Sequence, residues 1–169
     1  MQYTNRYQSP LGGILLAADE SGLTGLWFEA QKYFALRLDK EHEEKDTPVF
    51  DAAKCWLDQY FSGREPETAV PLHLTGTPFQ NSVWELLRAI PYGQTTTYGS
   101  LAKRLAGERG LSHMSPQAVG GAVGHNPVSI LVPCHRVLGA NGSLTGYAGG
   151  LDKKKALLSL EGARTGRLR

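Results

Sequence analysis

A cysteine and a histidine are adjacent at positions 134 and 135, inside a mostly apolar run that spans residues 130–138. The run is typical of a buried strand, and Pro133 interrupts it directly before Cys134. A thiol beside His135, with Arg136 next, has neighbours of the kind that lower the pKa of a cysteine from about 8.5 towards neutrality. The pattern predicts a nucleophilic Cys134, although a lone cysteine at a strand end is more often a small buried hydrophobe.

Glu161, at the end of the last expected helix, is the acid available to orient the imidazole of His135. In such a set the histidine accepts the thiol proton, directly or through a water, and the carboxylate stabilises the imidazolium. Two reaction classes fit: acyl transfer, as in cysteine hydrolases, and attack on an activated alkyl carbon. Hydrolysis also needs an oxyanion hole and release of the acyl group, whereas alkyl transfer needs only an aligned thiolate and a proton for the leaving group.

Helices in the C-terminal half must hold these side chains in place. Thr77-Pro78 and Ser115-Pro116 each put a capping residue before a proline, which is typical of a helix start. With the apolar spacing that follows, helices are expected at residues 78–90, 98–106, 117–124 and 151–160. The second and third of these predict a helix-turn-helix whose slim, glycine-rich recognition helix can approach a duplex closely, though a tight helix–helix contact would select the same small residues.

The N-terminal half predicts a small antiparallel sheet. Apolar and polar residues alternate over residues 3–8, 13–19 and 22–28, with turn-forming residues between them. Thr47-Pro48 then begins a helix that stops at Ser62-Gly63 and is expected to cover the sheet.

The rest of this half is less regular. A short helix is considered at residues 33–38, and residues 63–76, with two prolines and no clear period, predict a link between domains. We therefore expect an α+β fold, with a supporting domain at residues 1–75 and a mostly helical domain, carrying the helix-turn-helix and the active-site cysteine, at residues 76–169.

Charge is distributed unevenly between these halves. Residues 1–75 carry 7 Lys and Arg against 12 Asp and Glu, whereas residues 76–169 carry 11 against 4. The C-terminal half is therefore the one suited to phosphates, although basic surfaces are also common in proteins that bind no nucleic acid.

Composition excludes several classes of protein. With 41% apolar and 20% charged residues the chain is typical of a globular protein, and it has neither a run long enough to span a membrane nor a leader pattern, so a cytoplasmic location is expected. The 2 cysteines and 5 histidines show no metal-ligand spacing. We expect no disulfide framework, no metal and no cofactor.

Four strings around the cysteine resemble one family, the O6-alkylguanine-DNA alkyltransferases, also called methylated-DNA:protein-cysteine methyltransferases. The strings are Asn126-Pro127, Pro133-Cys134-His135-Arg136-Val137, Tyr147-Ala148-Gly149-Gly150 and Glu161-Gly162. The resemblance covers at least residues 77–162. It implies single-use repair of DNA, in which an alkyl group passes from guanine O6, and more slowly from thymine O4, to Cys134 after the base is flipped out of the duplex.

The resemblance also implies roles for individual residues. Cys134 would accept the alkyl group, His135 would act as base through a water, and Glu161 would be its carboxylate partner. Asn126 would brace the turn before the active-site strand, and Arg136 would fasten the active-site loop. Tyr98 would crowd the phosphate beside the lesion and donate a hydrogen bond to the purine. The backbone at Cys134 and Val137 would read the exocyclic amine of guanine, and the backbone N–H of Ala148, next to Tyr147, would meet O6. The expected partner is double-stranded DNA carrying O6-alkylguanine, and the expected state is a monomer.

Two departures from the family pattern affect DNA contacts. The slim helix carries Gln117 where the family usually places an arginine that fills the gap left by the flipped base, and glutamine lacks the cation and planar fork of arginine. Residues 107–115 also make the helix connection longer than the tight turn of the family.

Three other functions fit parts of the pattern. A lesion-binding protein without transfer activity would resemble the alkyltransferase-like proteins, which lack the acceptor cysteine. A transcription regulator would use the helix-turn-helix alone and leave the Cys-His-Glu set unexplained. Turnover of a soluble ester would indicate a cysteine hydrolase.

Overall fold

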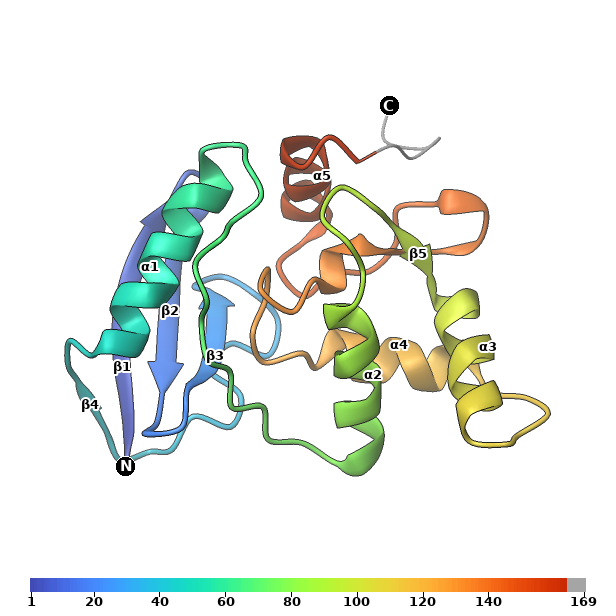
Figure 1. Ribbon diagram of the computed structural model, residues 1–169, viewed down its shortest axis with the longest axis horizontal. Helices are drawn as coiled ribbons and strands as arrows, with labels where there is room; N and C mark the ends of the chain where they lie inside the picture. Colours follow the sequence, from blue (N-terminus) through green and yellow to red (C-terminus); the bar gives the residue numbers. More distant parts are fainter. Residues whose placement is uncertain (164–169) are drawn as a thin grey trace. The chain divides into compact units, whose positions relative to one another are not determined.

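The structure is a computed structural model, and it describes residues 1–163 (Figure 1). Its internal contacts divide the chain into two compact units. One contains Met1–Thr75 together with Pro127–Ser129, and the other contains Gly76–Asn126 and residues 130–163. A small mixed sheet and a set of helices make up these units, so the expected α+β class is confirmed.

The first unit is built on a sheet with the strand order β3-β2-β1-β4. Strands β1 (Gln2–Ser9), β2 (Gly12–Ala18) and β3 (Leu23–Phe28) are antiparallel neighbours, as the alternating pattern predicted. The short strand β4 (His42–Glu44) adds to β1 in parallel. It was not expected, because three exposed polar residues carry no apolar alternation.

Helix α1 (Pro48–Phe61) packs on this sheet, as its sequence predicted (Figure 1). Its N-cap is Thr47, whose side chain accepts a hydrogen bond from the N–H of Phe50. Apolar side chains at helical spacing face the strands and are fully buried: Phe50, Ala53, Leu57 and Tyr60. This face supplies one side of the core of the unit.

The helix considered at residues 33–38 does not form. Tyr33, Ala35 and Arg37 have positive φ angles of 59°, 55° and 70°, and a right-handed helix cannot pass through left-handed residues. The segment turns instead, so that Ala35 and Leu38 pack against a small apolar cluster of the sheet.

The second unit contains the helices α2 (Pro78–Arg88), α3 (Tyr98–Glu108), α4 (Pro116–Gly124) and α5 (Leu151–Leu160). The first three contact one another, and the indole N–H of the buried Trp84 donates to the carbonyl of Ala122 at 2.9 Å. Helices α3 and α4 occupy the positions expected for the helix-turn-helix.

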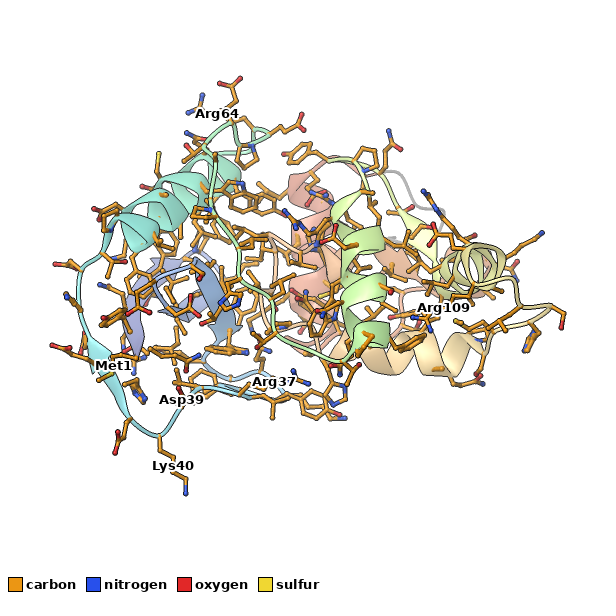
Figure 2. All side chains as sticks on the ribbon, turned by 60° about the horizontal axis from the view of Figure 1, so that its bottom comes forward. Met1, Arg37, Asp39, Lys40, Arg64 and Arg109 are labelled. Carbon is orange, nitrogen blue, oxygen red and sulfur yellow. The ribbon has the colours of Figure 1, made fainter. Side chains whose placement is uncertain are left out.

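The long connection between α3 and α4 is held against α2. Arg109, labelled in Figure 2, lies 5.3 Å from the centre of the Phe79 ring and donates to the hydroxyl of Ser82 at 3.3 Å. Gly110 follows with a φ of 66°, which glycine adopts without strain. Arg109, the first residue after α3, therefore anchors the long connection to α2.

The sequence predicted one buried strand over residues 130–138, and the structure shows that this prediction is wrong. Cys134–Arg136 form a single 3-10 turn, and only Val137–Leu138 are extended, as strand β6. Pro133 cannot donate a ladder hydrogen bond, and Ile130 has a φ of 71°, so the chain bends before the cysteine. Strand β6 pairs in parallel with β5 (Thr96–Thr97), and this pairing brings the start of α3 beside the cysteine turn.

Candidate active site

Cys134 is the first residue of the 3-10 turn and is 6% exposed. Burial raises the pKa of its thiol, opposed by a hydrogen bond with Asn126, by the charge of Lys154 and by backbone N–H groups of the turn. The expectation of a lowered thiol pKa is therefore wrong for the resting protein, in which Cys134 is protonated. A nucleophilic role for Cys134 would therefore require the loss of this proton.

Asn126 connects the end of α4 to the cysteine turn. Its side chain is buried, and its amide donates to the carbonyl of Val132 at 2.7 Å. Since the same side chain also bonds to Cys134, it fixes the backbone on the N-terminal side of the thiol. This geometry is compatible with the bracing role that the family resemblance implied for Asn126.

His135 and Glu161 form a fully buried pair, with 2.6 Å between Nε2 and Oε2. Burial lowers the pKa of His135, and the hydrogen bond and charge of Glu161 oppose that effect without reversing it. An ionised carboxylate only accepts hydrogen bonds, so Nε2 carries the hydrogen and Nδ1 is the acceptor nitrogen of the neutral ring. The imidazole is thus in the tautomer that can receive a proton at Nδ1.

Glu161 accepts hydrogen bonds from three residues. Beyond His135, its donors are Arg136 Nε at 2.8 Å, Arg136 Nη2 at 3.1 Å and the backbone N–H of Gly93 at 3.1 Å. Burial would raise the pKa of this carboxyl, but its bonds with His135 and Arg136 lower it to about 2. Arg136 also donates to the carbonyl of Ile90 at 2.7 Å, so it joins the 3-10 turn to the end of α2.

Tyr98 and Gln117 line an open pocket, whose walls are completed by Thr97, Gly99, Pro116, Gly120, Ala140 and Asn141. Burial, with a smaller electrostatic effect from the titratable thiol of Cys134, raises the pKa of Tyr98 to about 12, so its hydroxyl stays a donor. A side chain at Gly120 would contact the Tyr98 ring at 3.8 Å. The exposed Gln117 accepts a hydrogen bond from the hydroxyl of Ser115 at 2.8 Å.

The remaining predicted residues lie on the segments around this network. Val137 is buried in β6, directly after the 3-10 turn. Tyr147 and Ala148 are half-buried in the loop that leads to α5, where the carbonyl of Tyr147 accepts from the N–H of Gly150 at 3.0 Å. Cys134, His135 and Glu161 are all buried, and His135 and Glu161 are joined directly.

The sequence prediction missed Lys154, which was assigned to a solvated face or to phosphates. The residue is 0% exposed, and its ammonium donates to the carbonyls of Val137 (2.5 Å), Thr145 (2.8 Å) and Gly146 (2.9 Å). A signal was present, because the buried residues of α5 and its cap follow helical spacing: Lys154, Leu157, Leu158 and Glu161. A lysine within an apolar stripe is a candidate for burial.

Within residues 1–163, no cluster of three or more His, Cys, Asp or Glu side chains could hold a metal ion. None of the helices of that part is long and apolar enough to cross a membrane.

Two family models match the chain. The 6-O-methylguanine DNA methyltransferase ribonuclease-like domain matches residues 2–74, and the DNA-binding domain of the same family matches residues 78–163. Together they account for both halves of the sequence.

Individual proteins match over nearly the whole chain. Methylated-DNA–protein-cysteine methyltransferases of Haemophilus influenzae and Methanosarcina acetivorans are 41% and 46% identical, over 94% and 93% of this chain and 86% and 96% of their own lengths. A crystal structure of Mycobacterium tuberculosis OGT in complex with DNA is similar with a TM-score of 0.81 and 42% identity, over 96% of this chain and 94% of that one. An O6-methylguanine DNA methyltransferase from Methanococcus jannaschii is similar with a TM-score of 0.62 and 28% identity, over 95% of each chain.

Proposed function

The chain belongs to the 6-O-methylguanine DNA methyltransferase family, as its sequence motifs indicated, and we propose that it repairs DNA by moving an alkyl group from guanine O6 to the sulfur of Cys134. The observation that carries this proposal is the buried Cys134 beside the neutral, Glu161-bound His135. Relatives named for methyl transfer to a protein cysteine support the reaction class.

The proposed transfer needs only the side chains of Cys134, His135, Glu161 and Tyr98. The thiol proton passes to Nδ1 of His135, directly or through a water, while Glu161 stabilises the imidazolium. The thiolate attacks the alkyl carbon, the sulfur–carbon bond forms and the carbon–O6 bond breaks. Over the whole reaction the thiol proton replaces the alkyl group on guanine, and Tyr98 donates a hydrogen bond to the departing purine. A thioether has no route back to the thiol here, so each molecule acts once.

The base must leave the duplex before it can reach a buried thiol. Helices α3 and α4 supply the proposed DNA-binding element, and the pocket lined by Tyr98 and Gln117 is the proposed entry for the nucleotide. The backbone at Val137 would read the exocyclic amine of guanine, and the N–H of Ala148, next to Tyr147, would meet O6. The proposed partner is therefore double-stranded DNA carrying O6-alkylguanine, with thymine O4 as a slower site, and one monomer acts per lesion.

The test is the intact mass of the protein after mixing with a duplex that carries one O6-methylguanine. We expect the mass of one methylene to be added per molecule, and peptide mapping to place it on Cys134. The exposed Cys55 provides a matched control: Cys55→Ser should be methylated like the wild type, and Cys134→Ser should not. Unchanged mass with tight, lesion-selective binding would instead indicate a damage-binding protein.

Gln117 is expected to limit the affinity of the protein for DNA in which the damaged nucleotide is flipped out of the duplex. Gln117→Arg adds a cation and a planar fork in the pocket, so affinity for lesion-containing duplex should rise roughly tenfold and the repair rate should rise with it. Gln117→Lys is the control for charge alone, and it should gain salt-sensitive affinity without the gain in rate. The measurements are binding titrations at two salt concentrations and single-turnover repair rates; equal values for Gln117→Arg and the wild type would contradict this role.

A further inference from the structure

Lys154 is a fully buried cation whose partners are neutral. Its three N–H donors bind the three carbonyl oxygens of Val137, Thr145 and Gly146, which uses every hydrogen that an ammonium can donate. Lysine is almost never fully buried unless it is paired, because burial removes the hydration of its charge. The carbonyl groups solvate the ammonium, but they supply no negative charge.

The group beside Lys154 that becomes an anion on losing its proton is the thiol of Cys134. The ammonium of Lys154 binds the carbonyl of Val137, and the N–H of Val137 bonds in turn to the carbonyl of Cys134, so the charge lies beside the turn that carries the thiol. At this position Lys154 and Cys134 each favour the charged form of the other. The other acid near the cysteine turn, Glu161, is bound to His135 and Arg136. Burial lowers the pKa of Lys154 to about 8, so its ammonium is charged at neutral pH.

Two other side chains, Tyr98 and His135, are influenced by the ammonium of Lys154. Its Nζ lies 5.9 Å from the centre of the Tyr98 ring, a cation–π contact. Its charge also lowers the pKa of His135, which keeps that ring neutral before the reaction. Lys154 therefore acts electrostatically on the two residues between which the proposed mechanism moves the thiol proton, and its ammonium binds the backbone carbonyls of residues 137, 145 and 146.

We propose that Lys154 is a positioning residue for alkyl transfer: its ammonium is the counter-charge of the Cys134 thiolate, and its three hydrogen bonds hold residues 145–146 beside β6. This inference rests on the proposed function for the identity of the reaction. The electrostatic part does not, because it concerns the thiol in the protein without DNA.

The test uses the Cys55→Ser background, in which Cys134 is the single thiol. The rate of its alkylation by iodoacetamide, measured against pH, reports the thiol pKa. Lys154→Gln keeps hydrogen-bond donors without the charge, and we expect it to raise the thiol pKa by about one unit, so that alkylation at neutral pH slows about tenfold. Lys154→Arg restores a cation and should bring the thiol pKa back towards the wild-type value.

Two neighbours on the same helix give matched controls. Lys153→Gln and Lys155→Gln remove the same charge from α5 at a half-buried and an exposed position, and neither should move the thiol pKa. A merely structural Lys154 would change thermal stability or amide exchange of residues 145–146 while the thiol pKa stayed in place, and that result would overturn the proposal. Methyl transfer from DNA to the wild-type protein tests the proposed function separately, since iodoacetamide needs no DNA.

Discussion

Replacing Glu161 with glutamine is expected to lower the free energy of unfolding by about 3–5 kcal/mol, the usual cost of removing one partner from a buried ion pair. The carboxylate accepts from His135, from two nitrogens of Arg136 and from the N–H of Gly93. A glutamine offers one acceptor oxygen, and its NH₂ group would face some of these donors with hydrogens of its own. Arg136 would then be a buried charge without a counter-ion. Urea denaturation of the two proteins measures the difference.

The exposed pair of Arg88 and Glu85 provides the control. Its atoms are 3.1 Å apart, and the side chain of Glu85 is 69% exposed. Ion pairs on the surface contribute little to protein stability, so Glu85→Gln should change the free energy of unfolding by less than about 1 kcal/mol. Equal losses in the two variants would show that the buried network around Glu161 is not the source of the stability.

The same carboxylate predicts an acid-sensitive stability. The pKa of Glu161 is about 2 in the folded protein against an ordinary value of 4.5, so its contribution is complete above the unfolded pKa and is lost as the pH falls through the folded one. The contribution is about 3 kcal/mol, and its loss falls between about pH 5 and pH 2. Unfolding free energies measured across this window should fall less steeply for Glu161→Gln than for the wild type.

Features encoded by neighbours in sequence were predictable. Thr47 and Thr77 cap the helices that follow them, and both helices begin at the prolines that the sequence indicated. The three antiparallel strands follow from period-two alternation. The pairing of His135 with Glu161 was also anticipated from residue types whose chemistry is specific, and the structure joins the two side chains at 2.6 Å.

Features that depend on burial were not predictable in the same way. The adjacency of Cys134 and His135 suggested a thiol with a lowered pKa, but desolvation raises it, and desolvation depends on the whole fold. Lysine is usually a surface residue, and Lys154 is buried because backbone carbonyls from β6 and from the loop before α5 converge on its ammonium. Strand β4 likewise exists only because β1 offers it an edge.

Replacing His135 with glutamine is expected to slow methyl transfer by about 10²–10⁴-fold, the range in which a positioned general base contributes. Because the resting thiol is protonated, the wild type needs an acceptor for its proton within the pocket, and Nδ1 of the neutral His135 is the acceptor that we propose. Single-turnover transfer from an O6-methylguanine duplex, with lesion affinity measured in parallel, separates this loss from a loss of binding.

The dependence of the rate on pH gives the sharper distinction. In the proposed mechanism of the wild type the proton moves from Cys134 to His135 without leaving the protein, so the rate should stay level through neutral pH and fall where acid protonates the imidazole, below its ordinary pKa of 6.5. In His135→Gln the thiolate can form only by losing its proton to solvent, so the rate should rise about tenfold for each pH unit below the raised thiol pKa. A level profile in the variant would show that another group accepts the proton. A tenfold rise per unit in the wild type would show that His135 does not accept it.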